Sequence, residues 1–332
     1  MVVALTMAIM GYSQNSLVAT LSHNGEISAF YGASALQEAH DASQHGDIIT
    51  LSSGTFVAAD IKKALTIRGA GMYVDSVTHI LPTVITGNFY IEISDSIEQH
   101  LTMEGIYNNN TISVKGTLKE ASFQKCRLKS FTYYNFTSTK MDKLTFVHCK
   151  ITSNINIPKI GQTSFLNCYV AEPSAASDYA SSSMDFVNCI VENSYVDHIY
   201  NSSLTNCIIK TYGNYLPSSS TALYCLGINS SDSDNYNIFY YEPKIGSTMY
   251  TGELNELFKT YTGTYDDDET FELTDAAKAL YVGNDLKQVG MYGGIFPFSS
   301  IPTNPRIVKC NVASESTADG KLSVDIEVSS AE

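Results

Sequence analysis

Positive charge is scarce in this chain. The 332 residues include 20 Lys and Arg against 34 Asp and Glu, and only three of the basic residues are arginines. Proteins that bind nucleic acid need clustered Lys and Arg to neutralise phosphates. We therefore exclude nucleic acid as a partner. The formal net charge of −14 also disfavours anionic polysaccharides, unless a local basic groove is present.

Long hydrophobic runs are missing as well. The longest N-terminal run, Val2 to Met10, is too short to span a bilayer, so we expect no membrane-spanning segment in the mature chain. Gly11 and Ser13 follow it at the spacing that a signal peptidase prefers, which predicts a signal peptide over residues 1–13 and a secreted or cell-surface protein. No basic residue precedes the run, so a buried N-terminal strand is the alternative.

Metal-binding cysteine pairs are absent too. The sequence has no C-x-x-C motif and its seven histidines are scattered, so we do not expect a zinc site. Charged residues make up only 16% of the chain, whereas hydrophobic residues make up 44%. Ser, Thr, Asn and Gly fill the difference, and this mixture favours strands joined by polar turns.

What the chain does contain is a repeat of about twenty residues. Six cysteines recur at intervals of 23, 19, 21, 18 and 18 residues, in contexts such as SFLNCYV and DFVNCIV. They are Cys126, Cys149, Cys168, Cys189, Cys207 and Cys225. The earlier segments HLTMEGIYN and ALTIRGAGM keep the pattern, with Ile106 and Ala70 at the cysteine position and Gly105 and Gly69 before it.

The repeat predicts a sharp bend before each cysteine. Phe186 and Cys189 cannot face one core from a flat strand, because side chains alternate between its two faces. Asn and Gly readily adopt a left-handed backbone conformation, so a bend at Asn188 would turn both side chains inward. We predict a solenoid of parallel coils, with a ladder of Asn167, Asn188 and Asn206. His148 takes the same position as a structural substitute.

The cysteines are predicted to form an inner column of buried free thiols. Disulfides are the alternative, because a secreted protein permits them. Regular packing in successive coils explains the spacing without any bridge.

The flanking segments complete a five-part map of the chain. Asn24-Gly25 predicts a hairpin, and residues 35–42 predict a short helix with one apolar face. Alternating apolar residues on both sides of Asp319-Gly320 predict a second hairpin near the C-terminus. The parts are a signal peptide (1–13), an N-terminal cap (14–46), a parallel β-helix (47–241), a wrapped non-repeat segment (242–305) and a C-terminal hairpin (306–332).

These motifs carry a resemblance to a known family. ALQEAHDASQHGDIITLSSGTF, followed by ALTIRGAGM and the F-x-N-C-x-I repeats, resembles the right-handed parallel β-helix, or pectin-lyase-like, superfamily over roughly residues 33 to 240. The resemblance implies an all-β solenoid whose first coil is capped by a helix. TDAAKALYVGNDLKQVGMYGGIFPF and the terminal hairpin are similar to uncharacterised secreted β-helix proteins of gut-associated bacteria, which implies a location but no activity.

Many members of that family cleave acidic polysaccharides, with calcium and a basic residue or with paired aspartates. The sequence lacks a complete set of these residues. The candidate catalytic residues are Asp197, His198, Arg127 and Lys150. Asp232 and Asp234 are candidates for a calcium site, with a polar loop as the alternative, and we expect no other cofactor.

Tyrosine is abundant, with 22 residues and no Trp. Several tyrosines follow a motif cysteine at similar offsets and are predicted to lie along one side of the solenoid, where their rings could stack on sugars. They are Tyr133, Tyr134, Tyr179, Tyr195, Tyr200, Tyr212 and Tyr215. The alternative is that they fill loops and flank strands.

The hypothesis that follows is a non-catalytic secreted or surface protein that binds a polysaccharide or a surface protein along the solenoid. A polysaccharide lyase or glycoside hydrolase is one alternative. A structural adhesin or stalk component that assembles through the terminal hairpin is the other. Fold alone does not choose among them.

Overall fold

The computed structural model describes most of the chain. The described residues are 17–93, 100–115, 118–133, 141–157, 160–174, 181–193, 198–212, 215–229, 237–241, 244–260, 269–313, 315–317 and 319–329. The predicted signal peptide lies outside them. No helix among them is long and apolar enough to cross a membrane.

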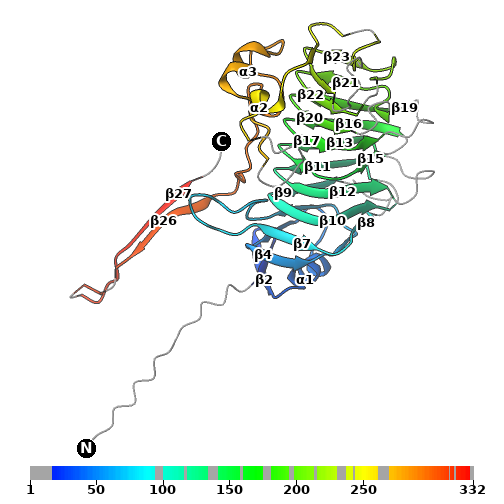
Figure 1. Cartoon of the computed structure of the whole chain (residues 1–332). Coiled ribbons are helices and arrows are strands. Elements are labelled where there is room, and N and C mark those ends of the chain that lie inside the picture. The colour runs from blue at the N-terminus through cyan, green and yellow to red at the C-terminus, as the bar shows by residue number, and fades with distance from the viewer. Residues whose placement is uncertain are drawn as a thin grey trace, which may run out of the picture.

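The chain folds into a parallel β-solenoid of about eight coils, which confirms the predicted all-β class (Figure 1). Two long sheets run along the stack. The first sheet has 11 strands, in the order β2 (Glu26–Tyr31), β1 (Val18–His23), β3 (Ile48–Leu51), β6 (Leu65–Arg68), β9 (His100–Glu104), β11 (Glu120–Gln124), β13 (Lys143–Val147), β16 (Ile160–Leu166), β19 (Ser181–Val187), β21 (Ser203–Thr205) and β23 (Thr221–Leu223).

The second sheet has 14 strands. Its main path, from the N-terminal end, is β4 (Gly54–Val57), β7 (Thr83–Thr86), β10 (Ile106–Val114), β12 (Arg127–Tyr133), β14 (Lys150–Ile151), β17 (Tyr169–Ala171), β20 (Ile190–Asn193), β22 (Ile208–Thr211), β24 (Leu226–Asn229) and β25 (Thr248–Tyr250). Short strands extend it beside this path: β5 (Asp60–Ile61), β8 (Phe89–Ile91), β15 (Ile155–Asn156) and β18 (Pro173–Ser174). Because β25 pairs with β24, the sheet continues past residue 241, where the sequence repeat ends.

A single left-handed residue joins the two sheets in seven successive coils. These residues have φ between +50° and +64°: Gly105, Lys125, His148, Asn167, Asn188, Asn206 and Tyr224. The bend at Asn188 lets Phe186 and Cys189 both face the core, where each is 0% exposed. The predicted change of strand parity is therefore present.

The core repeats along the stack. The rings of Phe123, Phe146, Phe165 and Phe186 stack on one another, with centroids 5.1, 5.1 and 4.7 Å apart. Burial of each ring contributes about 2 kcal/mol. The six repeat cysteines are free and buried. Each thiol donates to a carbonyl of the preceding coil, as Cys189 Sγ does to Phe165 O at 3.3 Å. Burial raises the pKa of Cys126, which keeps its thiol protonated and unreactive.

The first copy of the repeat departs from the prediction. Gly69 is not left-handed, and the chain makes an excursion over residues 70–82 before it enters β7. Thr83, not Ala70, lies in register with Ile106. A Cβ on Gly69 would overlap the Gly105 carbonyl oxygen, so this glycine is required for close backbone packing.

The N-terminal cap forms as its sequence predicts. β1 and β2 pair antiparallel around Asn24 and Gly25, whose φ angles of 49° and 87° suit a tight hairpin turn. Helix α1 (Ala35–Ala42) buries Ala35, Leu36 and Ala39 against the first coil. The apolar end of the solenoid is thereby removed from water.

The C-terminal part packs along one side of the solenoid (Figure 1). Helices α2 (Leu254–Leu257) and α3 (Asp275–Leu280) belong to a segment that we call the cover, residues 254–260 and 269–281. Residues 282–304, which we call the strap, then run back along the stack. The hairpin of β26 (Arg306–Val312) and β27 (Val324–Ser329) follows and projects from the body (Figure 1).

Candidate functional site

The outer face of the second sheet is covered from β17 to β24. Tyr169, Ile190, Ile208 and Leu226 lie in register in adjacent strands, immediately after the cysteines, and are at most 2% exposed. They form a second apolar core with the cover, in which the Tyr169 ring stacks on Phe271 at 5.1 Å. This part of the face is therefore filled by the protein itself.

The bends are covered by the strap. The side-chain amide of Asn167 donates to the carbonyls of Met291 and Gly293, at 2.9 and 2.8 Å. The amide of Asn206 exchanges two hydrogen bonds with Asn284, both at 2.9 Å. Two of the three ladder residues thus have a role that the sequence did not predict, because their amides hold the strap.

The bend at His148 and the end of β9 at Glu104 also contact the strap. His148 Nε2 lies 3.1 Å from the Phe296 carbonyl oxygen, and burial lowers the pKa of this imidazole. At the far end, the backbone N–H and the hydroxyl of Thr303 both donate to Glu104. The strap is therefore held along most of the length of the stack.

The outer face of the first sheet is different. One column of short polar side chains crosses eight strands in register, and each of its members is half-buried. The column consists of Thr66, Thr102, Ser122, Thr145, Ser164, Asp185, Ser203 and Thr221. Adjacent strands are about 4.8 Å apart, so the column presents one polar group per coil. We call this surface the hydroxyl face.

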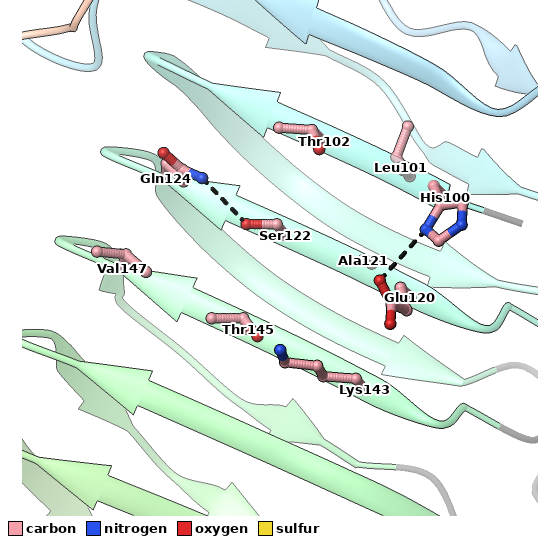
Figure 2. A pocket seen from close by; sticks show the side chains of 10 residues that line it. All are labelled: His100, Leu101, Thr102, Glu120, Ala121, Ser122, Gln124, Lys143, Thr145 and Val147. Carbon is pink, nitrogen blue, oxygen red and sulfur yellow. Dashed lines mark hydrogen bonds and ion pairs between the residues drawn. The ribbon is translucent and has the colours of Figure 1, made fainter. Parts of the chain in front are cut away.

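The hydroxyl face contains two adjoining shallow depressions, of about 250 and 380 Å³, which share His100 and Thr102. Figure 2 shows the first of them, which lies over β9, β11 and β13. His100 and Glu120 point toward each other, with Nδ1 and Oε2 3.3 Å apart, and each side chain is about half exposed. Lys143 follows in the next strand.

Hydrogen bonding dominates the chemistry of this face. The Gln124 amide donates to the Ser122 hydroxyl at 3.3 Å (Figure 2). Both oxygens of Asp185 accept bonds, from Gln162 and Ser203, at 2.6 Å each. Glu120 and Asp185 are three strands apart, or about 14 Å, which exceeds the separation of about 5–9.5 Å that glycosidases use. These two carboxylates therefore do not form a hydrolytic pair.

The described candidates among the predicted catalytic residues do not lie on the hydroxyl face. Arg127 and Lys150 are directly opposite each other on β12 and β14 of the second sheet. Lys150 is 4% exposed and donates to the Glu269 carbonyl at 3.3 Å, and the Arg127 guanidinium lies 4.3 Å from the ring centroid of Tyr107. His198 is exposed on the connection between β20 and β21. Asp197 lies outside the described residues.

The predicted tyrosine column is wrong at its first member. Tyr133 is 1% exposed and its hydroxyl donates to Met141 Sδ at 3.0 Å, so its ring cannot meet a glycan. Tyr200 is half-buried and Tyr212 is 62% exposed. Tyr215 contacts the rings of Tyr240 and Tyr241 in a local cluster. Tyr134, Tyr179 and Tyr195 lie outside the described residues.

Metal binding stays a prediction. Within the described ranges, no three His, Cys, Asp or Glu side chains come close enough together to hold a metal ion. The calcium candidates Asp232 and Asp234 lie outside those ranges.

The hydroxyl face was missed in the sequence, although its signal is present. In the repeats the residue before the inward aromatic or aliphatic position is Ser, Thr or Asp, as in SFQKC, TFVHC and DFVNC. Because a strand alternates, the neighbour of an inward residue points outward. A repeated hydroxyl at that position predicts a polar outer column.

No family model, no curated protein and no solved structure matched the chain. The parallel solenoid is confirmed by the structure alone. The resemblance to the pectin-lyase-like superfamily remains a prediction from the motifs.

Proposed function

We propose that the hydroxyl face binds a neutral glycan and that the protein works outside the cytoplasm, secreted or on the cell surface. The observation that carries the proposal is the uninterrupted polar column on the first sheet, beside a second sheet whose outer face the cover fills from β17 to β24. Binding, and no covalent step, is the activity that this face supports.

The side chains on the face suit a polyhydroxylated ligand. Ser and Thr hydroxyls both donate and accept hydrogen bonds, and the Gln124 and Gln162 amides add further donors and acceptors. The depressions are shallow, and a long open surface suits an extended chain better than it suits a small enclosed molecule. A net charge of −14 opposes an anionic polymer.

A protein partner on the hydroxyl face is less favoured than a glycan. Interface centres are enriched in aromatic residues and Arg and are depleted in Ser. The column holds Ser, Thr and one Asp, and no aromatic residue. The composition of the hydroxyl face therefore favours a glycan.

The test is retention of the purified chain on a panel of neutral and anionic polysaccharides, by affinity electrophoresis, with new reducing ends measured in the same samples. We expect retention on at least one neutral polymer and no new reducing ends. Retention on no polymer contradicts the proposal. New reducing ends would instead support the lyase or hydrolase alternative.

A double variant, S122A with T145V, locates the binding site. Two lost hydrogen bonds at about 0.5–1.5 kcal/mol each predict roughly tenfold weaker retention. T248V is the matched control, because Thr248 is exposed on β25 of the second sheet. Equal retention of the double variant and the wild type would place binding elsewhere.

A further inference from the structure

The C-terminal hairpin carries an apolar face that the rest of the described chain does not bury. Val324, Ile326 and Val328 alternate along β27, and Val312 of β26 lies directly opposite Val324. These four side chains are 50–57% exposed. We call this surface the aliphatic strip.

The opposite face of the hairpin is charged. Asp325 and Glu327 alternate with the strip residues, and Lys309 forms an ion pair with Asp325 at 2.7 Å. The hairpin is therefore amphipathic, with one face suited to water and one suited to burial.

The hairpin is connected to the body mainly through its base. Its backbone hydrogen bonds within the described residues are internal, as from Ala313 N to Ser323 O at 2.9 Å. The Thr303–Glu104 contacts fix the strap just before it, and the hairpin then points away from the solenoid (Figure 1). A lone two-stranded hairpin is marginally stable in water, so covering the strip would stabilise it.

We propose that the aliphatic strip pairs with the same strip of a second copy of this chain, in a two-fold dimer. An uncharged strip of Val and Ile is complementary to itself, which a two-fold interface requires. Edge pairing of two β27 strands is disfavoured, because it would set Asp325 and Glu327 of each copy against the same acids of the other. Face-to-face packing leaves these acids in water.

The area of the aliphatic strip is small for a protein–protein interface. Covering four half-exposed aliphatic side chains on each copy, with the backbone between them, removes on the order of 700 Å² from water in total, below the about 1,200 Å² minimum of standard stable interfaces. The pairing is therefore weak and reversible, and it forms only at high protein concentration. This association does not depend on glycan binding.

Salt gives the dimer a specific signature. Two chains of net charge −14 repel each other, and salt screens that repulsion. Dimerisation through an aliphatic strip therefore strengthens as salt rises. An interface built on ion pairs would weaken under the same conditions.

The test is sedimentation velocity of the full chain across a wide concentration range. We expect a monomer–dimer equilibrium in the wild type, at least tenfold weaker association in I326K, and wild-type association in E327Q. Glu327 lies on the charged face, and both substitutions raise the net charge by one. A wild type that stays monomeric at the highest concentration overturns the proposal, as does undiminished association of I326K.

A second measurement on the wild type guards against loss of hairpin folding in I326K. Hydrogen–deuterium exchange of the amides in residues 324–329 should slow as protein concentration rises, because the dimer covers the strip and stabilises the hairpin. Exchange that is independent of concentration would overturn the proposal. Protection that moves to β2 at the N-terminal end would do the same and would place the contact there.

Discussion

The two outer faces of the solenoid share one interior and differ in what they show to the outside. On the second sheet, Ile190 and Ile208 follow the motif cysteines and lie beneath the cover. On the first sheet, Thr145 and Ser164 precede the inward phenylalanines and lie in the open column. The type of residue at one outward position per strand separates the covered face from the open face.

The largest expected effect comes from placing a charge on each face. I208D puts a carboxylate where the side chain is 1% exposed, which should lower the free energy of unfolding by about 4 kcal/mol or detach the cover. T221D adds the same charge to the open column and should change it by no more than about 0.5 kcal/mol. Chemical denaturation measures both. Equal losses of unfolding free energy in I208D and T221D would contradict the difference between the covered face and the open face.

The bends that join the two faces give a smaller effect. N167G keeps the left-handed backbone and loses the two hydrogen bonds to the strap, whereas N167L also adds backbone strain. We expect N167L to be less stable than N167G by about 1–2 kcal/mol, the cost of a left-handed conformation for an ordinary residue. The difference in melting temperature between the two variants measures this strain. Variants of equal stability would mean that the bend does not need Asn or Gly.

The pH dependence of the strap is the smallest expected effect. Burial lowers the pKa of His148 in the folded state, so the unfolded chain binds the proton more readily. The contribution of His148 to stability is therefore present above its ordinary pKa of about 6.5 and is lost as pH falls below it. H148N keeps a residue that tolerates the bend and removes the titration. Melting temperatures between pH 5 and 8 should vary less in H148N than in the wild type, and an unchanged slope would contradict this reading.

Local rules in the sequence predict much of the fold. Asn188 and Gly105 mark bends because few residues tolerate a left-handed backbone, and Asn24-Gly25 marks a hairpin for the same reason. The regular interval between the cysteines then fixes the stack. These features are local or repeated, and either property allows them to be predicted from a single sequence.

Features that depend on how strands align after an insertion in a coil cannot be predicted from the sequence in this way. Ala70 fits the motif, but the excursion over residues 70–82 moves its place to Thr83. Tyr133 lies at the predicted offset from Cys126, yet β12 turns it into the core. The number of residues between a motif cysteine and a tyrosine predicts the side of the solenoid on which the tyrosine lies only where every coil has the same length.

Tertiary partners are the other part that the sequence did not predict. The strap is separated from Asn167 by more than one hundred residues, and nothing in the motif says that its amides would bind Met291 and Gly293. The predicted site residues Arg127 and Lys150 were singled out for their charge, but Lys150 donates to the Glu269 carbonyl of the cover and Arg127 lies against the ring of Tyr107. Charge alone did not distinguish a covered lysine from an open one.

The most direct test of the open-face claim is carboxyl footprinting of the full chain, with and without the polysaccharide that retains it. Glu120 is about half exposed on the hydroxyl face, and Glu256 is exposed on α2 of the cover. We predict that the bound glycan slows modification of Glu120 and leaves Glu256 unchanged. Protection of Glu256 with Glu120 still modified at its free rate would place the ligand on the covered side and contradict the account.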